Sequence, residues 1–239
     1  MKKKIFYEHD DITRTSIGVE YEKYLHQSQS KYQKIEIIKT KRYGNAMYLD
    51  GCFMLSEKNQ DFYHNTCKYL TPQSAKNILI VGGGDHALAY IISKAISINN
   101  IDIVEIDRDV VEVSRKYFSK YFKYSKKVES KIKLVIDDGM RYLKVNDKKY
   151  DCIIIDSTDP VDNAKVLFSK LFLMRCFNAL KSGGLLIQQS GSPIKDTYQI
   201  INPLKRKCKE VGFKKIELHT FPMPLYPTGT WSFITAKRA

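Results

Sequence analysis

The sequence predicts an α/β fold in which a mostly parallel, seven-stranded sheet follows a small antiparallel β domain. From about residue 60, apolar runs of strand length alternate with helical segments, which is typical of parallel strands joined by crossover helices. Before residue 60, short strand-like runs are separated by turn signals. We therefore divide the chain into an N-terminal β-hairpin domain, residues 1–60, and a larger α/β domain, residues 61–239.

Three strand-like runs indicate the N-terminal domain. Residues 35–40 are apolar or alternating, and the turn at 41–45 separates them from a second run at 46–49. Asp50-Gly51 is a strong hairpin signal and leads into a third run at 52–55. An antiparallel meander is therefore expected here.

The larger domain reads as strands and helices in alternation. Residues 78–81 form a continuous apolar run, as a strand covered on both faces requires. One helix is expected to end at Ser182-Gly183-Gly184, a C-terminal stop signal. The expected strands are 78–81, 101–105, 132–136, 152–156, 185–189, 214–220 and 231–236, and the expected helices are 61–70, 87–95, 110–118, 168–180 and 196–210.

Length and composition argue against a membrane-spanning, secreted or disulfide-stapled protein. The 239 residues suffice to bury a large core without disulfide or metal staples. No apolar run approaches the roughly 20 residues that span a bilayer. The basic start of the chain meets Glu8 where a signal peptide has its apolar core, so we expect a cytoplasmic protein without membrane contact. The five cysteines form no Cys-x-x-Cys pair, so we expect reduced thiols and no metal site.

The net charge of +14 can indicate a nucleic-acid-binding protein. Here, however, the 40 lysines and arginines are spread along the chain, and no RNA-binding motif accompanies them. A generally lysine-rich surface is therefore the preferred interpretation, and no nucleic-acid partner is expected.

Acidic residues follow four of the predicted strands, at Asp85, Glu105, Asp138 and Asp156. Ligands of open parallel sheets bind beyond the carboxyl ends of the strands, so these side chains are expected to meet in one site. Acids at helix starts also serve as ordinary caps, which is the structural alternative.

The first of these ends carries a glycine turn, formed by Gly82, Gly83 and Gly84 before Asp85. Glycines let the backbone turn sharply and approach a ligand closely. Glu105 ends the next strand, where an acid can hold both ribose hydroxyls. Asp138-Gly139 follows the third strand, where an adenine amino group would be met. Together they predict a Rossmann-like site for an adenosine-containing cofactor.

The loop acid selects the kind of cofactor. The phosphates of NAD favour a helix N-terminus without an acid, and Asp85 would repel them. A cationic tail would be attracted instead. We therefore expect a sulfonium, S-adenosylmethionine or a decarboxylated relative.

The segment Asp156-Ser157-Thr158-Asp159-Pro160 carries two carboxylates three residues apart on one loop. A desolvated carboxylate with a like-charged neighbour has a raised pKa and can act as a general base. The structural alternative is an Asx-turn closed by proline.

Short motifs also recur along the chain in a distinctive order and spacing. They are Phe6-Tyr7-Glu8, Tyr32-Gln33, Tyr43-Gly44, Leu49-Asp50-Gly51, Tyr63-His64, Gly82-Gly83-Gly84-Asp85, Val104-Glu105-Ile106-Asp107, Asp138-Gly139, Asp156-Ser157-Thr158-Asp159-Pro160, Gln188-Gln189-Ser190 and Pro224-Leu225-Tyr226-Pro227-Thr228-Gly229-Thr230-Trp231. In these motifs the chain resembles the polyamine aminopropyltransferases, commonly called spermidine synthases. The resemblance implies a Rossmann-like, methyltransferase-type catalytic domain and a homodimer or homotetramer.

The resemblance also implies a reaction, transfer of the aminopropyl group of decarboxylated S-adenosylmethionine to putrescine, giving spermidine and methylthioadenosine. No prosthetic group takes part. Carried over by position, Asp156 would be the base, aided by Tyr63 and Tyr226. The donor would be held by Gln33, Gly82, Gly83, Asp85, Glu105, Asp138, Gly139 and Asn163, and the amine by Glu8, His64, Asp85, Asp156, Ser157, Thr158, Asp159 and Gln189.

The chain departs from the family pattern at several positions. His86 replaces a glycine after the loop aspartate, and would either crowd the turn or point away from it. Asn59, Gln60 and Asn65 replace acids around the Tyr-His motif. Asp162-Asn163 replaces Gly-Pro in the loop that normally covers the adenine. These changes leave the choice of amine open.

Three other functions remain as alternatives. An N-methyltransferase that uses S-adenosylmethionine would need a partner for the donor's carboxylate, which Asp85 disfavours. A silent metabolite-binding protein would have no need of Asp156, Tyr63 and Tyr226. RNA binding is the third and rests on net charge alone.

Overall fold

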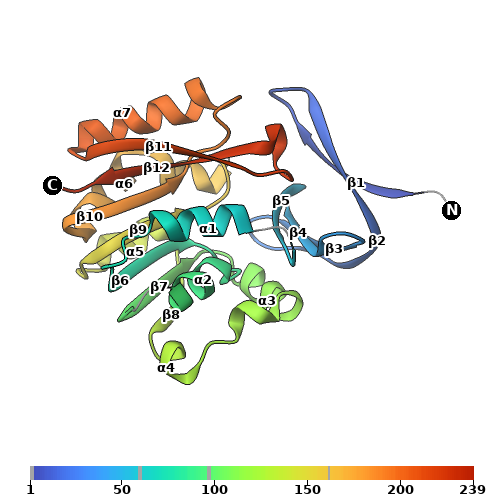
Figure 1. Cartoon of the computed structure of the whole chain (residues 1–239), viewed down its shortest axis with the longest axis horizontal. Helices are drawn as coiled ribbons and strands as arrows, with labels where there is room; N and C mark the ends of the chain where they lie inside the picture. The colour runs from blue at the N-terminus through green and yellow to red at the C-terminus, as the bar shows by residue number, and fades with distance from the viewer. Residues whose placement is uncertain (1–2, 59–60, 96–97, 161) are drawn as a thin grey trace.

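The protein folds into two β-sheets, one of them wrapped by helices. A computed structural model describes residues 3–58, 61–95, 98–160 and 162–239 (Figure 1). The first sheet has five strands in the order β1-β2-β3-β4-β5, and the second has seven in the order β11-β12-β10-β9-β6-β7-β8. The predicted fold class is confirmed: a small antiparallel sheet precedes a mostly parallel one.

The N-terminal sheet is an antiparallel meander. The three predicted strands are present, and a long hairpin precedes them. Asp50 and Gly51 both have positive φ angles, 48° and 82°, as the tight turn between the last two strands requires. The strands are β1 (Lys4–Asp10), β2 (Thr15–Gln29), β3 (Lys34–Thr40), β4 (Gly44–Leu49) and β5 (Cys52–Ser56).

The larger sheet is parallel except for β12, which runs antiparallel to both β10 and β11. β6 is a central strand between β9 and β7, and Ile78–Val81 are buried on both faces, as its apolar sequence predicts. The strands are β6 (Asn77–Gly82), β7 (Asn100–Glu105), β8 (Ile132–Ile136), β9 (Tyr150–Asp156), β10 (Leu180–Gln189), β11 (Lys214–Pro222) and β12 (Thr230–Lys237).

Helices cover both faces of this sheet. Alternate residues of β6 enter different cores: Ile78 and Ile80 pack with α1 and α2, whereas Leu79 and Val81 pack with α5, α6 and α7. The helices are α1 (Asp61–Leu70), α2 (Ala87–Ala95), α3 (Arg108–Tyr117), α4 (Lys126–Glu129), α5 (Gly139–Val145), α6 (Lys170–Ala179) and α7 (Asn202–Val211), with helical turns η1 (Ser119–Phe122), η2 (Asp162–Phe168), η3 (Thr197–Ile201) and η4 (Pro227–Gly229).

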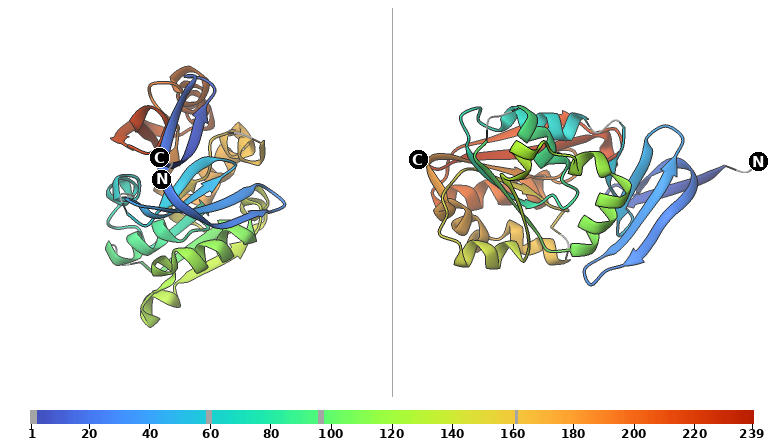
Figure 2. Two further views of the ribbon diagram at one scale, coloured as in Figure 1. Left: turned by 90° about the vertical axis from the view of Figure 1, so that its right-hand side faces the viewer. Right: turned by 90° about the horizontal axis from the view of Figure 1, so that it is seen from below.

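A third core joins the N-terminal sheet to helix α3 of the larger domain. Ile35, Ile37 and Met47 of the N-terminal sheet pack with Val110 and Val113 of α3. Figure 2 shows the N-terminal sheet at one end of the larger domain, with the chain termini at opposite ends. This packing holds the small sheet over the carboxyl ends of the parallel strands.

The helix stop predicted at Ser182-Gly183-Gly184 was wrong. The helix α6 ends at Ala179, and β10 begins at once at Leu180, so Ser182-Gly183-Gly184 belongs to the strand. The pairing of β10 with β9 shifts between Leu180 and Leu185. Gly183, at φ 78°, donates its N–H to the carbonyl oxygen of Arg238 over 2.8 Å. The glycines therefore make an irregularity in a strand and do not terminate the helix.

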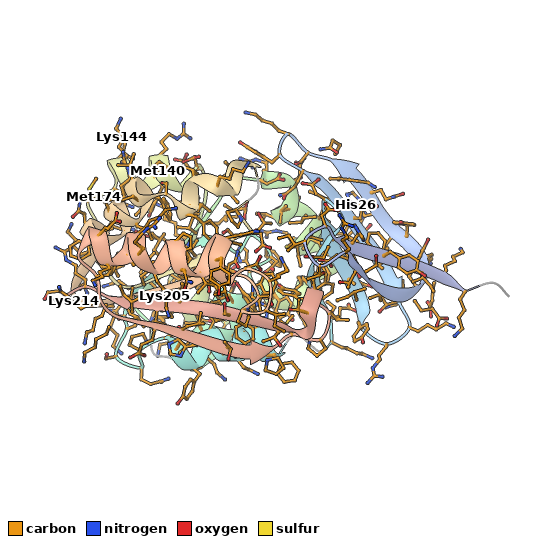
Figure 3. The ribbon with its side chains drawn as sticks, turned by 90° about the horizontal axis from the view of Figure 1, so that it is seen from above. His26, Met140, Lys144, Met174, Lys205 and Lys214 are labelled. Atoms are coloured by element: carbon orange, nitrogen blue, oxygen red, sulfur yellow. The ribbon has the colours of Figure 1, made fainter. Side chains whose placement is uncertain are left out.

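Lysines of the larger domain lie on its surface. Lys144 and Lys214 are exposed, and Figure 3 shows both at the end that lies away from the N-terminal sheet. None of the helices within the described residues is both long and apolar enough to cross a membrane.

Candidate active site

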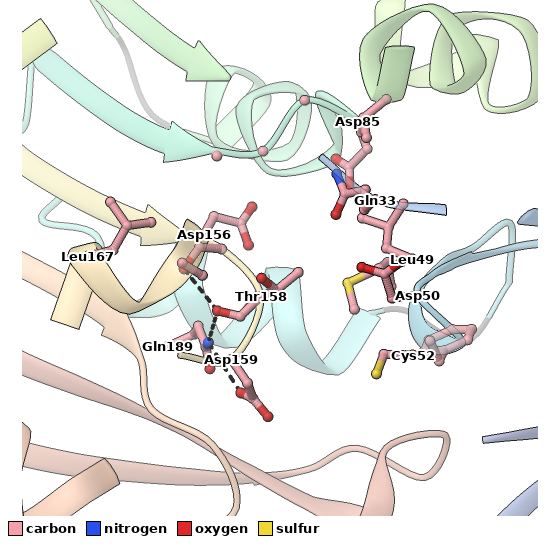
Figure 4. Close-up of a pocket in the computed structure, with 18 of the residues that line it drawn as sticks. Gln33, Leu49, Asp50, Cys52, Asp85, Asp156, Thr158, Asp159, Leu167 and Gln189 are labelled. Atoms are coloured by element: carbon pink, nitrogen blue, oxygen red, sulfur yellow. Dashed lines mark hydrogen bonds between the residues drawn. The ribbon is translucent and has the colours of Figure 1, made fainter. Parts of the chain in front are cut away.

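A cavity of about 500 Å³ lies between the carboxyl ends of the parallel strands and the N-terminal sheet (Figure 4). It brings together the predicted site residues from both parts of the chain. Those that line it are Glu8, Gln33, Tyr63, His64, Gly82, Gly83, Asp85, Glu105, Asp138, Gly139, Asp156, Ser157, Thr158, Asp159, Gln189 and Tyr226. The backbone of Asn163 lies in η2, and its side chain is outside the described part of the structure.

The glycine turn lies directly on the backbone of Asp156. Gly82 and Gly83 have φ angles of 85° and 66°. A Cβ atom on Gly82 would lie 2.0 Å from the carbonyl oxygen of Asp156, and the N–H of Gly83 donates to that oxygen over 3.1 Å. Only glycine fits this approach, which fixes the turn against the end of β9.

Glu105 is held at the end of β7 by two backbone groups. The N–H of Gly84 donates to its Oε2 over 3.1 Å, and the N–H of Asp107 donates to its Oε1 over 2.9 Å. A Cβ on Gly84 would lie 2.7 Å from the Glu105 Cγ, so this position also needs glycine. Burial raises the pKa of Glu105 to about 7. A carboxylate fixed beside the turn suits a ligand with vicinal hydroxyls.

Asp138 both caps a helix and lines the cavity. It is the N-cap of α5, where its Oδ1 accepts from the N–H of Arg141 over 2.9 Å. Gly139 behind it is buried, and a Cβ there would lie 2.6 Å from Val81 Cγ1. The capping role expected as the structural alternative is present, and the same residue lines the cavity.

Asp85 and Asp156 form a pair of enclosed carboxylates. Asp85 Oδ1 accepts from the N–H of Ala87 over 2.7 Å, at the start of α2. Burial raises the pKa of Asp85, and the charge of Asp156 raises it further. Burial also raises the pKa of Asp156. Two acids in one enclosed cavity favour a cationic ligand between them.

Two tyrosines surround Asp156. The hydroxyl of Tyr63 donates to Asp156 Oδ1 over 2.7 Å, and this bond lowers the pKa of the carboxyl against the effect of burial. The Tyr226 ring packs edge-on against Trp231, with centroids 4.6 Å apart. Burial raises the pKa of both tyrosines far above its usual range, so both keep their protons and can donate.

Beyond Asp156 the cavity continues between Asp159, Gln189 and Glu8. Gln189 Nε2 donates to the Thr158 carbonyl oxygen over 2.9 Å and to Asp159 Oδ1 over 3.4 Å, the contacts drawn in Figure 4. Glu8 Oε2 accepts from the N–H of Phe53 over 2.8 Å. Burial raises the pKa of Asp159 to about 6 and that of Glu8 to about 7. This half suits an ammonium.

Gln33 ties the N-terminal sheet to the larger domain. Its Nε2 donates to Asp107 Oδ2 over 2.9 Å, and the Ser30 hydroxyl donates to the same oxygen over 2.7 Å. Asp107 also caps α3 through the N–H of Asp109. The strand end that carries Glu105 is thereby joined to the loop that carries Gln33.

The residues that depart from the family pattern lie in different parts of the structure. His86 does not line the cavity: its ring stacks on Phe122 with centroids 4.3 Å apart, and its Nδ1 lies 3.1 Å from the hydroxyl of Tyr124. The second of the two sequence-based expectations for His86 therefore holds. Asn65 is exposed. Asn59 and Gln60, and the side chains of Asp162-Asn163, lie outside the described residues.

Sequence reasoning missed several charged residues at or near the cavity, among them Asp10, Asp107 and Lys195. Asp10 and Lys195 line it, and Asp107 positions Gln33 and Glu105. For Asp107, two residues beyond Glu105, the place after a strand end was an available signal. Asp10 lies on an N-terminal strand and Lys195 six residues beyond Gln189, so no local pattern joins them.

Comparison with known proteins gives consistent matches. Residues 60–239 match the spermine/spermidine synthase domain, and residues 5–57 match the spermidine synthase tetramerisation domain. A polyamine aminopropyltransferase of Methanocaldococcus jannaschii is 37% identical over 227 residues, which cover 93% of this chain and 76% of the relative. One from Stenotrophomonas maltophilia is 35% identical over 237 residues, covering 98% and 83%.

Solved structures agree. A spermidine synthase in complex with the transition state analogue AdoDATO superposes with a TM-score of 0.89 at 28% identity, covering 98% of this chain and 80% of that one. The spermidine synthase of Thermotoga maritima gives a TM-score of 0.86 at 27% identity, covering 100% and 81%. Since both family models and relatives above 30% identity match most of the chain, it belongs to the spermine/spermidine synthase family of aminopropyltransferases.

Proposed function

We propose that the protein transfers the aminopropyl group of decarboxylated S-adenosylmethionine to putrescine, forming spermidine, methylthioadenosine and a proton. The observation that carries this proposal is the position of Asp156. Its half-buried carboxylate, bonded to Tyr63, lies where the glycine turn meets the acidic half of the cavity. A base is needed there, because an amine with an ordinary pKa near 10 must lose a proton before it can attack carbon.

In this reaction the donor lies along the strand ends. Glu105 accepts hydrogen bonds from the ribose hydroxyls, and Asp138 accepts one from the adenine amino group. Gln33, Gly82, Gly83, Gly139 and Asn163 complete the proposed donor site. Asp85 pairs with the ammonium of the aminopropyl group. The carboxylate of ordinary S-adenosylmethionine would meet this acid instead, and like charges in a site of low polarity repel strongly.

The chemical step is a displacement at carbon. The neutral amine attacks the methylene carbon bonded to the sulfonium sulfur. A C–N bond forms, the C–S bond breaks, and its electron pair returns to sulfur, which leaves as the neutral thioether of methylthioadenosine. The proton lost by the amine passes to Asp156 and then to solvent. Tyr63 and Tyr226 hold the attacking nitrogen in line with the carbon, which lowers the entropy cost of reaction.

The acceptor's second ammonium lies in the acidic half of the cavity. Asp159 and Glu8 supply its charge partners, and Gln189, His64, Ser157 and Thr158 line the path. Their carboxylates compensate at short range for the basic surface, because ordinary salt screens charges beyond about 8 Å.

The replacement Asp156→Asn tests this assignment with a nearly isosteric side chain. The rate of spermidine formation from putrescine is expected to fall about 100- to 10,000-fold. The affinity for methylthioadenosine, measured by calorimetry, should change little, which separates loss of the base from loss of the site. Unaltered turnover in Asp156→Asn would remove Asp156 as the base. A panel of diamines in the same assay would test putrescine as acceptor, and faster turnover of another diamine would replace it.

Three further assignments stay predictions. The match to a tetramerisation domain supports an oligomer, which we propose to be a homodimer or homotetramer. Light scattering on the purified protein would test this. The cytoplasmic location and the division of the chain at residues 60 and 61 are proposed on the sequence alone.

A further inference from the structure

A lysine ammonium is buried in the wall of the acidic half of the cavity. Lys195 Nζ lies 3.1 Å from Asp196 Oδ2 and 3.3 Å from Asp10 Oδ2. The side chain of Lys195 is only 7% exposed, and those of Asp10 and Asp196 are 9% and 1% exposed. Such burial of a lysine is uncommon and requires close partners.

This ammonium lies at the end of the cavity where the acceptor's tail is proposed to bind. Lys195 and Asp10 line the cavity together with Glu8 and Asp159. The charge of Lys195 lowers the pKa of both Glu8 and Asp159. Its Nζ is also 5.9 Å from the centre of the Trp231 ring. Carboxylates and an aromatic face are the surroundings that an ammonium ligand would seek.

The loop after β10 is built to hold this ion pair. Asp196 Oδ2 accepts from the N–H of Ser192 over 2.8 Å. Gly191 has a φ of 76°, and a Cβ there would lie 2.6 Å from the same oxygen. The N–H of Gly191 donates to Gln189 Oε1 over 3.2 Å. Asp196 is therefore fixed beside Gln189, and the cage around Lys195 is part of the cavity wall.

We propose that Lys195 is a specificity-determining residue: its tethered ammonium occupies the subsite that a third amine of a longer acceptor would need, and so restricts the enzyme to diamines. This inference rests on the proposed function. Asp10 and Asp196 already have a cation, so Glu8 and Asp159 are left for the single distal ammonium of a diamine. A triamine such as spermidine would bring its next ammonium against Lys195, where both charge and volume exclude it.

The test compares acceptors in variants of Lys195. Lys195→Ala removes the charge and opens the cage, whereas Lys195→Arg keeps a cation. In Lys195→Ala the ratio of kcat/KM for spermidine to that for putrescine is expected to rise at least about tenfold, and in Lys195→Arg it should stay as in wild type. The matched control is Lys148→Ala, which also deprives a fully buried carboxylate, Asp102, of an ammonium at 2.9 Å, outside the cavity lining. It should leave the ratio unchanged.

A rescue experiment separates occupation of the cage from general loosening of the site. Ethylammonium chloride added to Lys195→Ala should refill the cage and suppress turnover of spermidine more than that of putrescine. Sodium chloride at the same ionic strength should affect both alike. Equal suppression by the two salts would contradict the role of Lys195.

Calorimetry keeps the test independent of turnover. Spermidine and putrescine would be titrated into wild type and Lys195→Ala, each saturated with methylthioadenosine. A tighter spermidine complex in Lys195→Ala supports the inference, and an unchanged spermidine-to-putrescine affinity ratio overturns it. Wild type that turns over neither amine contradicts the proposed function instead. A Lys195→Ala protein with putrescine turnover but no gain for spermidine contradicts only the role of Lys195.

Discussion

The hydroxyl of Tyr63 donates a 2.7 Å hydrogen bond to Asp156 Oδ1, joining α1 to the end of β9. Two opposing effects therefore act on this carboxyl. Burial raises its pKa, and the bond from Tyr63, which stabilises the charged form, lowers it. Tyr63 thus sets the pH at which the proposed base becomes active.

Replacing Tyr63 by Phe removes only the hydroxyl and so raises the pKa of Asp156. Because a base works in its ionised form, the acid limb of the pH profile of kcat/KM should move to higher pH, by about one unit. Profiles of wild type and Tyr63→Phe between pH 5 and 9 would measure the shift. An acid limb that stays in place, or moves down, would mean that Tyr63 does not tune the base.

Glu105 links the donor site to the pH dependence of stability. Burial raises its pKa from 4.5 to about 7, so the folded state binds the proton more tightly than the unfolded state. Its contribution to stability is therefore fully present below pH 4.5 and lost as the pH rises through about 7. Glu105→Gln removes this titration.

The unfolding free energy of wild type minus that of Glu105→Gln should then increase by about 2 kcal/mol as the pH falls from about 8 to about 5. Urea denaturation at several pH values measures this difference. A constant difference, or one of opposite sign, would contradict the raised pKa of Glu105.

The fit of the glycine turn predicts a severe effect of one methyl group. In Gly82→Ala the new Cβ would meet the Asp156 carbonyl oxygen at 2.0 Å, and the φ of 85° is strained for alanine. We expect loss of donor binding and destabilisation by several kcal/mol, roughly the range of overpacked sites.

Gly183→Ala is the matched control for this change. Gly183 also has a positive φ, 78°, but nothing lies within 4 Å of its Cβ position. The cost there should be only about 1 kcal/mol of backbone strain, with donor affinity retained. Thermal unfolding and methylthioadenosine binding of the two variants test the difference, which should vanish if Gly82 does not lie against Asp156.

Substitutions of His86 should change the free energy of unfolding but not the binding of the donor nucleoside. Its ring stacks on Phe122 outside the cavity, yet its φ of 64° favours glycine. Both His86→Ala and His86→Gly lose the stacking, but glycine relieves the backbone strain. His86→Gly should therefore be more stable than His86→Ala by about 0.5–1 kcal/mol, and both should bind methylthioadenosine like wild type. Weakened nucleoside binding in both variants would place His86 in the donor site after all.

The four parallel strands β6, β7, β8 and β9 were predictable, because in each case a largely apolar run of strand length ends at or just before an acid. That recurrence also located Asp85, Glu105, Asp138 and Asp156, since the carboxyl ends of parallel strands share one edge. The strand β10 was misjudged over residues 180–184 because glycines in a strand irregularity and at a helix end look alike in sequence. The long strand β2 was not delimited, because its residues are largely exposed or half-buried and carry no apolar run.

The acceptor end of the site depends on contacts that no local pattern encodes. Lys195 and Asp10 are 185 residues apart, and each alone looks like an ordinary surface charge. Only the folded chain shows that they pair with one another and that Lys195 also pairs with Asp196. Likewise, Gln33 and Glu105 are connected through Asp107, which accepts from the Gln33 side chain and donates its N–H to Glu105.

The most direct test of the proposed reaction is a comparison of two donors. The purified protein would be incubated with putrescine and either decarboxylated S-adenosylmethionine or S-adenosylmethionine, and the products identified by mass. Because Asp85 lines the donor half of the cavity and His86 turns away from it, neither residue offers a cation to the carboxylate of the ordinary donor. We predict spermidine and methylthioadenosine from the decarboxylated donor and no product from the other. A methylated amine from S-adenosylmethionine, or no product from either donor, would contradict aminopropyl transfer to putrescine.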